Sequence, residues 1–80
     1  MERIIRFTSK SRKHKIGKAH ALFVIENNEA IRQFGNEDFE SKLYWSGEDD
    51  RGLRLEIVGI DFGDEILIIH VMPESFRKRN

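Results

Sequence analysis

The sequence LRLEIVGIDFGDEILIIHVM, residues 53–72, decides the fold, because it combines two strand-forming runs with a turn between them. Residues 53–61 and 66–72 are rich in leucine, isoleucine and valine, which favour extended backbone. Residues 62–65 contain glycine and aspartate, which are frequent in the tight turns of antiparallel hairpins. The stretch therefore predicts a β-hairpin within an antiparallel sheet.

Alternation along this hairpin predicts a sheet that is apolar on both faces. Successive side chains of a strand point to opposite faces, and a tight turn pairs Ile57 with His70. One face is assigned to a covering helix and holds Leu53, Leu55, Ile57, Ile66 and Ile68. The opposite face holds Val58, Ile60, Leu67, Ile69 and Val71. Because one helix covers only one face, we expect the second face to bind a partner protein or a second copy, unless the C-terminal segment folds back over it.

The rest of the chain predicts a β-α-β-β-β order. The flanking segments supply the other expected elements: a strand over 3–8, a helix over 12–27 that breaks near Gly17, a further helical turn within 29–34, a strand over 42–46 and a turn over 47–52. Pro73 ends the last strand and can open a short C-terminal helix over 74–77. We expect one α+β domain over residues 1–80, an antiparallel sheet with helices packed on one face.

The composition is typical of a small cytoplasmic domain. The chain has 80 residues, 35% of them charged, a formal net charge of zero and no cysteine. The lack of cysteine excludes disulfides and thiolate metal sites. No apolar run approaches the roughly 20 residues that span a bilayer, and no signal peptide is recognisable. We therefore expect no membrane association and a cytoplasmic location.

The zero net charge hides a segregation of charge along the chain. Residues 1–20 hold seven lysines and arginines against one acid, residues 77–79 are basic, and most acids lie between them. Clustered cations bind phosphate backbones. We therefore predict RNA as a partner, contacted by Arg12, Lys13, Lys15, Lys18, His20 and Lys78. The alternative is a basic helix face that is merely solvated.

Two histidines are candidates for proton transfer. RNA cleavage by the neighbouring 2′-OH needs a base, an acid, and cations that stabilise the charged transition state. His14, with His20 as its alternative, lies among the basic residues, and His70 lies in the last strand. Histidine exchanges protons near neutral pH. Arg77 is the third predicted catalytic residue, as a phosphate contact. For His70 the alternative is a structural role, hydrogen-bonded within the sheet.

No residue cluster predicts a metal or another cofactor. His14 and His20 lie six positions apart and do not share a helix face as an i, i+4 pair would. Residues 48–50 are acidic but lack the spacing of a calcium-binding loop, and acids of this kind suit a turn. We expect neither a metal site nor a cofactor.

Several features together carry a family resemblance: a basic helix start with Arg12, His14 and Ile16, a charged turn between Gly47 and Gly52, and a last strand that ends in His70. Their order resembles the small bacterial toxins of the RelE superfamily, in particular the BrnT-like branch. Arg77 matches a later arginine of that branch, and Met72 stands where its members usually carry another.

The resemblance implies a RelE-like fold and a metal-independent endoribonuclease that a protein antitoxin neutralises by covering the active surface. It also implies that arginine, lysine and sometimes histidine or acidic side chains perform the chemistry. The alternative function is a non-enzymatic module that binds nucleic acid or a protein through its basic ends and its spare apolar face.

Overall fold

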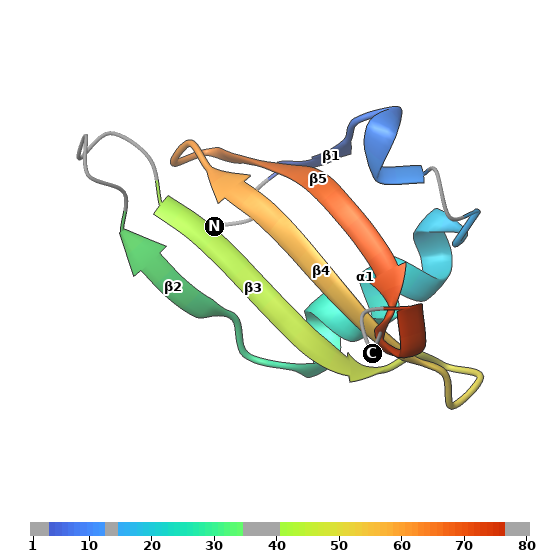
Figure 1. The fold of residues 1–80 in the computed structure, drawn as a ribbon. Coiled ribbons are helices and arrows are strands. Elements are labelled where there is room, and N and C mark those ends of the chain that lie inside the picture. The colour runs from blue at the N-terminus through green and yellow to red at the C-terminus, as the bar shows by residue number, and fades with distance from the viewer. Residues whose placement is uncertain (1–3, 13–14, 35–40, 77–80) are drawn as a thin grey trace.

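The structure, a computed structural model, describes residues 4–12, 15–34 and 41–76, and it places one α-helix against one face of a five-stranded sheet (Figure 1). The described elements follow in chain order: β1 (Ile4–Phe7), the 3-10 helix η1 (Lys10–Arg12), α1 (Lys18–Asn27), β2 (Ile31–Phe34), β3 (Ser41–Glu48), β4 (Arg54–Asp61), β5 (Glu65–Pro73) and the 3-10 helix η2 (Glu74–Phe76). The expected α+β class is confirmed.

The sheet is mixed rather than wholly antiparallel. Its strands lie in the order β1-β5-β4-β3-β2. The predicted meander of β3, β4 and β5 is confirmed, and β2 adds an antiparallel edge, whereas β1 pairs in parallel with β5. The parallel pair arises because the chain crosses from β1 through α1 to the far edge of the sheet, from which the meander returns to β1.

A β-bulge in β5 changes the predicted register of the hairpin. The register shifts after Val58, which leaves Ile69 as an extra residue of β5. Ile57 consequently pairs with Val71 rather than with His70, and Val71 is only 2% exposed. One extra residue reverses the alternation of side chains, so Val71 belongs to the core. Its assignment to the partner interface is therefore wrong.

The helical segments are shorter than predicted. α1 begins at Lys18 rather than at residue 12, because Gly17 is an extended N-cap with φ −66° and ψ 150°, and residues 10–12 form the separate η1. η2 is a single 3-10 turn, too short for an α-helical hydrogen-bond pattern, so the expected C-terminal helix is not formed in the described residues. No helix in the described part of the chain is long and apolar enough to cross a membrane.

Two segments take different positions from those predicted. Residues 31–34 form β2 instead of a helical turn, because Ile31 and its neighbours pair along β3. Leu53 precedes β4 and is 37% exposed, so it is not part of the buried core. The preceding turn ends one residue later than the sequence indicates.

The core lies between α1 and the sheet. Its buried side chains are Ala21, Val24, Leu43, Trp45, Leu55, Ile57, Ile66, Ile68 and Val71. We call the other side of the sheet the open face, since α1 packs on the opposite side (Figure 1). Its half-buried apolar side chains include Tyr44, Val58, Ile60, Leu67 and Met72. Val58, Ile60 and Leu67 thus lie where alternation predicts, and Ile69 is half-buried at the bulge.

Replacing Gly59 by alanine is expected to lower the free energy of unfolding by about 1–3 kcal/mol, because the core has no room for a methyl group. A Cβ there would lie 3.0 Å from Ile68 Cδ1, 3.1 Å from Ile66 Cγ2 and 3.3 Å from Trp45 Cζ3. Urea unfolding followed by Trp45 fluorescence measures the loss. Ser46→Ala, at an exposed position of β3, is the control and should stay within about 0.5 kcal/mol of wild type.

Candidate functional site

The predicted nucleic-acid and catalytic residues fall into three groups. His14, Lys13, Arg77 and Lys78 lie outside the described residues, and the side chain of Arg12 is likewise not described. Lys15, Lys18 and His20 lie at the start of α1. His70 lies on β5, at the open face.

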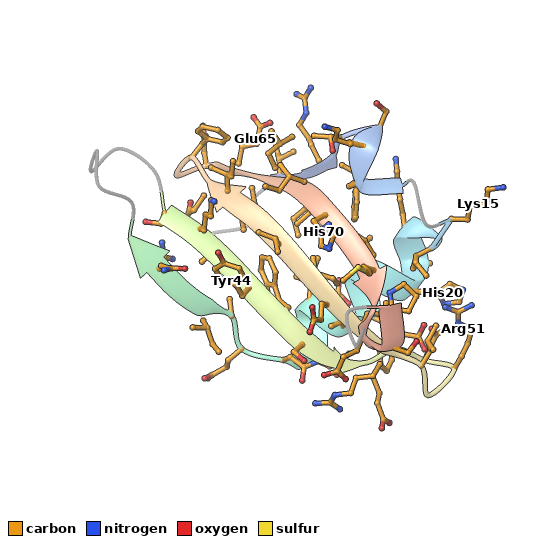
Figure 2. The ribbon with its side chains drawn as sticks, viewed as in Figure 1. Lys15, His20, Tyr44, Arg51, Glu65 and His70 are labelled. Carbon is orange, nitrogen blue, oxygen red and sulfur yellow. The ribbon has the colours of Figure 1, made fainter. Side chains whose placement is uncertain are left out.

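A cluster at the start of α1, which we call the basic corner, consists of Lys15, Lys18, His20, Asp50 and Arg51. It joins the first turn of α1 to the turn between β3 and β4, and Figure 2 shows Lys15, His20 and Arg51 at the same end of the molecule. Lys15, Lys18 and Arg51 are exposed. Lys18 Nζ also lies 5.7 Å from the ring centre of Phe7, which limits where its charge can move.

Asp49 organises the turn that carries Asp50 and Arg51. Its Oδ1 accepts hydrogen bonds from the backbone N–H groups of Arg51 (2.8 Å) and Leu53 (3.0 Å). Its Oδ2 accepts from Nε (3.0 Å) and Nη2 (2.6 Å) of Arg51. Burial raises the pKa of Asp49, but the hydrogen bonds and the charge of Arg51 outweigh it, so the pKa lies below its ordinary value. The turn role expected for this acidic stretch is confirmed for Asp49.

Asp50 holds the imidazole of His20. The Nδ1 of His20 lies 2.6 Å from Oδ1 of Asp50, a contact between residues thirty positions apart in the chain. A carboxylate only accepts hydrogen bonds, so Nδ1 carries the proton and Nε2 of the neutral ring is left as the basic nitrogen. Among the described residues, Nε2 has no hydrogen-bond partner.

A hollow lies beside the segment that leads into α1. It has a volume of about 460 Å³ and is lined by Ser9, Lys15, Ile16 and Gly17. A Cβ on Gly17 would lie 3.5 Å from Cδ2 of His20, so the imidazole lies close to Gly17, one of the residues that line the hollow. An anion that enters the hollow would meet the charge of Lys15.

The same corner is poorly suited to a metal ion. His20, Asp49 and Asp50 each offer a ligand atom, and these atoms lie within 4.8 Å of one another. However, each oxygen of Asp49 already accepts two N–H hydrogen bonds. The two on Oδ2 come from the guanidinium of Arg51. A cation would have to displace this positive group and break the turn. The corner is better suited to bind an anion through its lysines.

His70 belongs to a different surface. It follows Ile31, Tyr44 and Val58 in one row across the open face, as the strand registers show. This row lines a groove of about 500 Å³ together with Glu29, Trp45, Ser46, Glu56, Ile57 and Met72. Figure 2 shows His70 and Tyr44 over the sheet, away from His20. The structure therefore does not bring His20 and His70 together.

Sequence reasoning misses Asp50 and Arg51 as functional residues, and it offers His20 only as the alternative to His14 for proton transfer. The pairing of His20 with Asp50 has no local signal, because the two residues belong to elements thirty positions apart. The one available hint is the composition of residues 49–52, because an acidic, basic and glycine-containing stretch predicts a surface turn.

Comparison with known proteins identifies no relative. No protein-family model matches the chain, and neither the curated proteins nor the solved structures contain a significant match. Function is therefore inferred from the residues and geometry of this chain.

Proposed function

We propose that this protein is a metal-independent endoribonuclease of the small-toxin type, with a RelE-like arrangement, which a protein antitoxin neutralises. The observation that carries the proposal is the His20–Asp50 pair, 2.6 Å apart, beside the exposed cations of the basic corner. A histidine held by a carboxylate is a suitable general base, and neighbouring lysines attract the RNA backbone. The order of elements that resembles the BrnT-like branch supports the same class.

In the proposed reaction, Nε2 of His20 accepts the proton of a ribose 2′-OH. The 2′-oxygen then bonds to the adjacent phosphorus while the bond to the 5′-oxygen breaks, leaving a 2′,3′-cyclic phosphate and a 5′-hydroxyl. Lys15 and Arg51 contribute positive charge where the phosphorane develops negative charge. A water molecule gives a proton to the departing 5′-oxygen, because Lys18 Nζ lies over the Phe7 ring and its side chain does not share a helix face with His20. Asp50 acts as a positioning residue, because it orients the ring without contacting RNA.

The histidines and the arginine predicted from the sequence remain part of the proposal. His14 directly precedes Lys15 and is a second candidate for donating the proton to the leaving group. Arg77 is a further candidate phosphate contact. His70 lies on the open face, and His20 takes its place as the proposed base.

An RNA cleavage assay tests the proposal. Purified protein is incubated with a structured and an unstructured RNA, with and without ribosomes, in EDTA. We expect cleavage that leaves 2′,3′-cyclic phosphate and 5′-hydroxyl ends, since the attacking group is the neighbouring 2′-OH. A His20→Asn protein purified in parallel controls for contaminating nucleases. If wild type cleaves neither RNA under any of these conditions, the protein is not a ribonuclease.

RNA binding is expected to weaken with salt, with a slope of about −3 to −4 in log affinity against log salt concentration, as about four neutralised phosphates require. Fluorescence anisotropy of a labelled RNA at several salt concentrations measures the slope. Lys15→Ala is expected to reduce its magnitude by about one, whereas Arg32→Ala, far from the corner and ion-paired with Asp61, should not. Salt-independent binding would exclude a phosphate contact surface.

A second candidate function is a non-enzymatic binding module. The specific observation in its favour is the open-face groove of about 500 Å³, whose lining is rich in apolar side chains such as Ile31, Val58 and Met72. Binding of RNA or protein without any RNA cleavage would support the module. A small antitoxin-like protein encoded by the adjacent reading frame would favour the toxin instead.

A further inference from the structure

Phe23 is an exposed aromatic side chain on the outer side of α1. It is 39% exposed and stands outside the core, to which this helix contributes Ala21 and Val24. Aromatic side chains ordinarily bury their large apolar area, so an exposed ring does not add to the stability of the core. It does offer a flat apolar surface to a ligand.

Phe23 lies one helical turn from His20, the proposed general base. Residues three positions apart on a helix share a face, with about 5–6 Å between their Cβ atoms. Helical side chains lean toward the N-terminus, so the ring of Phe23 leans toward the turn that carries His20. The turn on the other side of Phe23 carries the exposed Glu26. The aromatic ring therefore lies between the imidazole and an acidic side chain.

The charges on either side of the ring select the part of a nucleotide that can contact it. Lys15 and Lys18 are exposed on its N-terminal side, and neither is ion-paired with a carboxylate of the described residues. A phosphate is attracted to these lysines and repelled by Glu26. A nucleobase is neutral, and its face stacks well on a phenyl ring. Phe23 is therefore suited to contact a base, while the phosphates stay near the lysines.

We propose that Phe23 is a stacking platform for an unpaired RNA base next to the phosphate that is cleaved. This inference rests on the proposed function, because it places the ribose of that nucleotide at Nε2 of His20. The base on this ribose then lies one helical turn away, over Phe23. Within a duplex each base is already stacked between its neighbours, so only a single strand presents a free base face here. Phe23 thus makes the site selective for unpaired RNA.

Oligonucleotide binding by Phe23→Leu tests the stacking contact. The probe is a 2′-O-methyl RNA, which has no free 2′-OH to attack the phosphate, so binding is measured apart from cleavage. By fluorescence anisotropy, Phe23→Leu is expected to bind the single strand at least about 5-fold more weakly than wild type. The slope of log affinity against log salt should not change, because no charge is lost. A duplex of the same sequence should bind both proteins equally.

Probes that each lack one base locate the contact. Removal of the base that stacks on Phe23 should weaken binding to wild type about as much as Phe23→Leu does, and should not weaken binding to Phe23→Leu further. Phe23→Trp keeps a stacking ring and should bind at least as tightly as wild type. Phe62→Leu is the matched control. Phe62 is 50% exposed and follows β4, at the opposite end of the sheet from the β3–β4 turn (Figure 1), so its loss should leave binding unchanged.

The stacking contact and the ribonuclease activity can fail separately. If wild type cleaves RNA and Phe23→Leu binds the probe as tightly as wild type, the stacking proposal is wrong and the proposed function stands. Losses that add when the ring and any one base are both removed also contradict stacking. If the ring and one base share a single loss but wild type cleaves no RNA, the proposed function fails and the base contact remains. Wild type that does not bind the probe at low salt overturns both.

Discussion

Replacing Asp49 by alanine is expected to lower the free energy of unfolding by about 3 kcal/mol, because one side chain satisfies four N–H donors in the turn between β3 and β4. The two backbone donors, on Arg51 and Leu53, lose their acceptor in a part-buried site. Loss of the contact with the Arg51 guanidinium accounts for a smaller part of this decrease in stability. The Arg51 side chain is 47% exposed, so water can replace the lost hydrogen bonds. Three kcal/mol is a large share of the roughly 4–12 kcal/mol typical of a domain of this size.

Urea unfolding followed by Trp45 fluorescence measures this loss, because Trp45 is buried on β3 next to the turn. Asp50→Ala is the matched control: it removes an exposed carboxylate whose hydrogen-bond partner among the described residues is His20, and it should cost less than about 1 kcal/mol. An Asp49→Ala protein as stable as the control would show that the turn is held by its backbone alone.

The same residue gives the protein a defined response to acid. The pKa of Asp49 is lower in the folded protein than its ordinary value of 3.8, because its hydrogen bonds favour the charged form more than burial opposes it. Its contribution to stability is therefore complete above about pH 4 and is lost as the pH falls through the folded pKa. The difference in unfolding free energy between wild type and Asp49→Asn should shrink below pH 4 and stay constant between pH 5 and 7. A difference that does not change with pH would contradict this assignment.

The central meander could be predicted from the sequence because its strands are dominated by local signals. Alternating apolar residues, the glycine-containing turn at 62–65 and the stop at Pro73 all act within a few positions. The bulge at Ile69 could not be predicted in this way. It depends on how Gly59 lets the core side chains Ile66 and Ile68 approach β4, which is a property of the packed sheet. Without the bulge, simple alternation assigns Val71 to the wrong face of the sheet.

The edge strands and the candidate site depend on distant contacts, which local patterns do not report. β1 can pair in parallel with β5 because α1 crosses the sheet between these two strands in the chain. β2 has just four residues, and their sequence is as compatible with a helical turn as with a strand. The His20–Asp50 pair likewise depends on the fold, which brings α1 against the β3–β4 turn. The sequence predicts the basic character of this region, and the structure adds the carboxylate that orients the histidine.

Replacing His20 by asparagine is expected to lower the rate of RNA cleavage by about 10²-fold or more, the scale of a lost general base. The amide N–H of asparagine can still donate to Asp50 in place of Nδ1, so the link between α1 and the turn is kept while the basic Nε2 is removed. RNA binding, measured by anisotropy, should change by less than about 3-fold because the lysine charges remain. Loss of activity with retained binding separates a role in proton transfer from a structural role.

Two further variants distinguish the roles of the neighbouring residues. Asp50→Asn should lower kcat by about 10-fold while the Kd for RNA stays the same, because Asp50 orients the imidazole without touching the substrate. Lys15→Ala should do the reverse, weakening binding with a smaller effect on kcat. If His20→Asn cleaves RNA at the wild-type rate, His20 is not the base, and His14 and His70 are the next candidates. The cleavage rate of His70→Asn would then show whether catalysis takes place on the open face, where His70 lies.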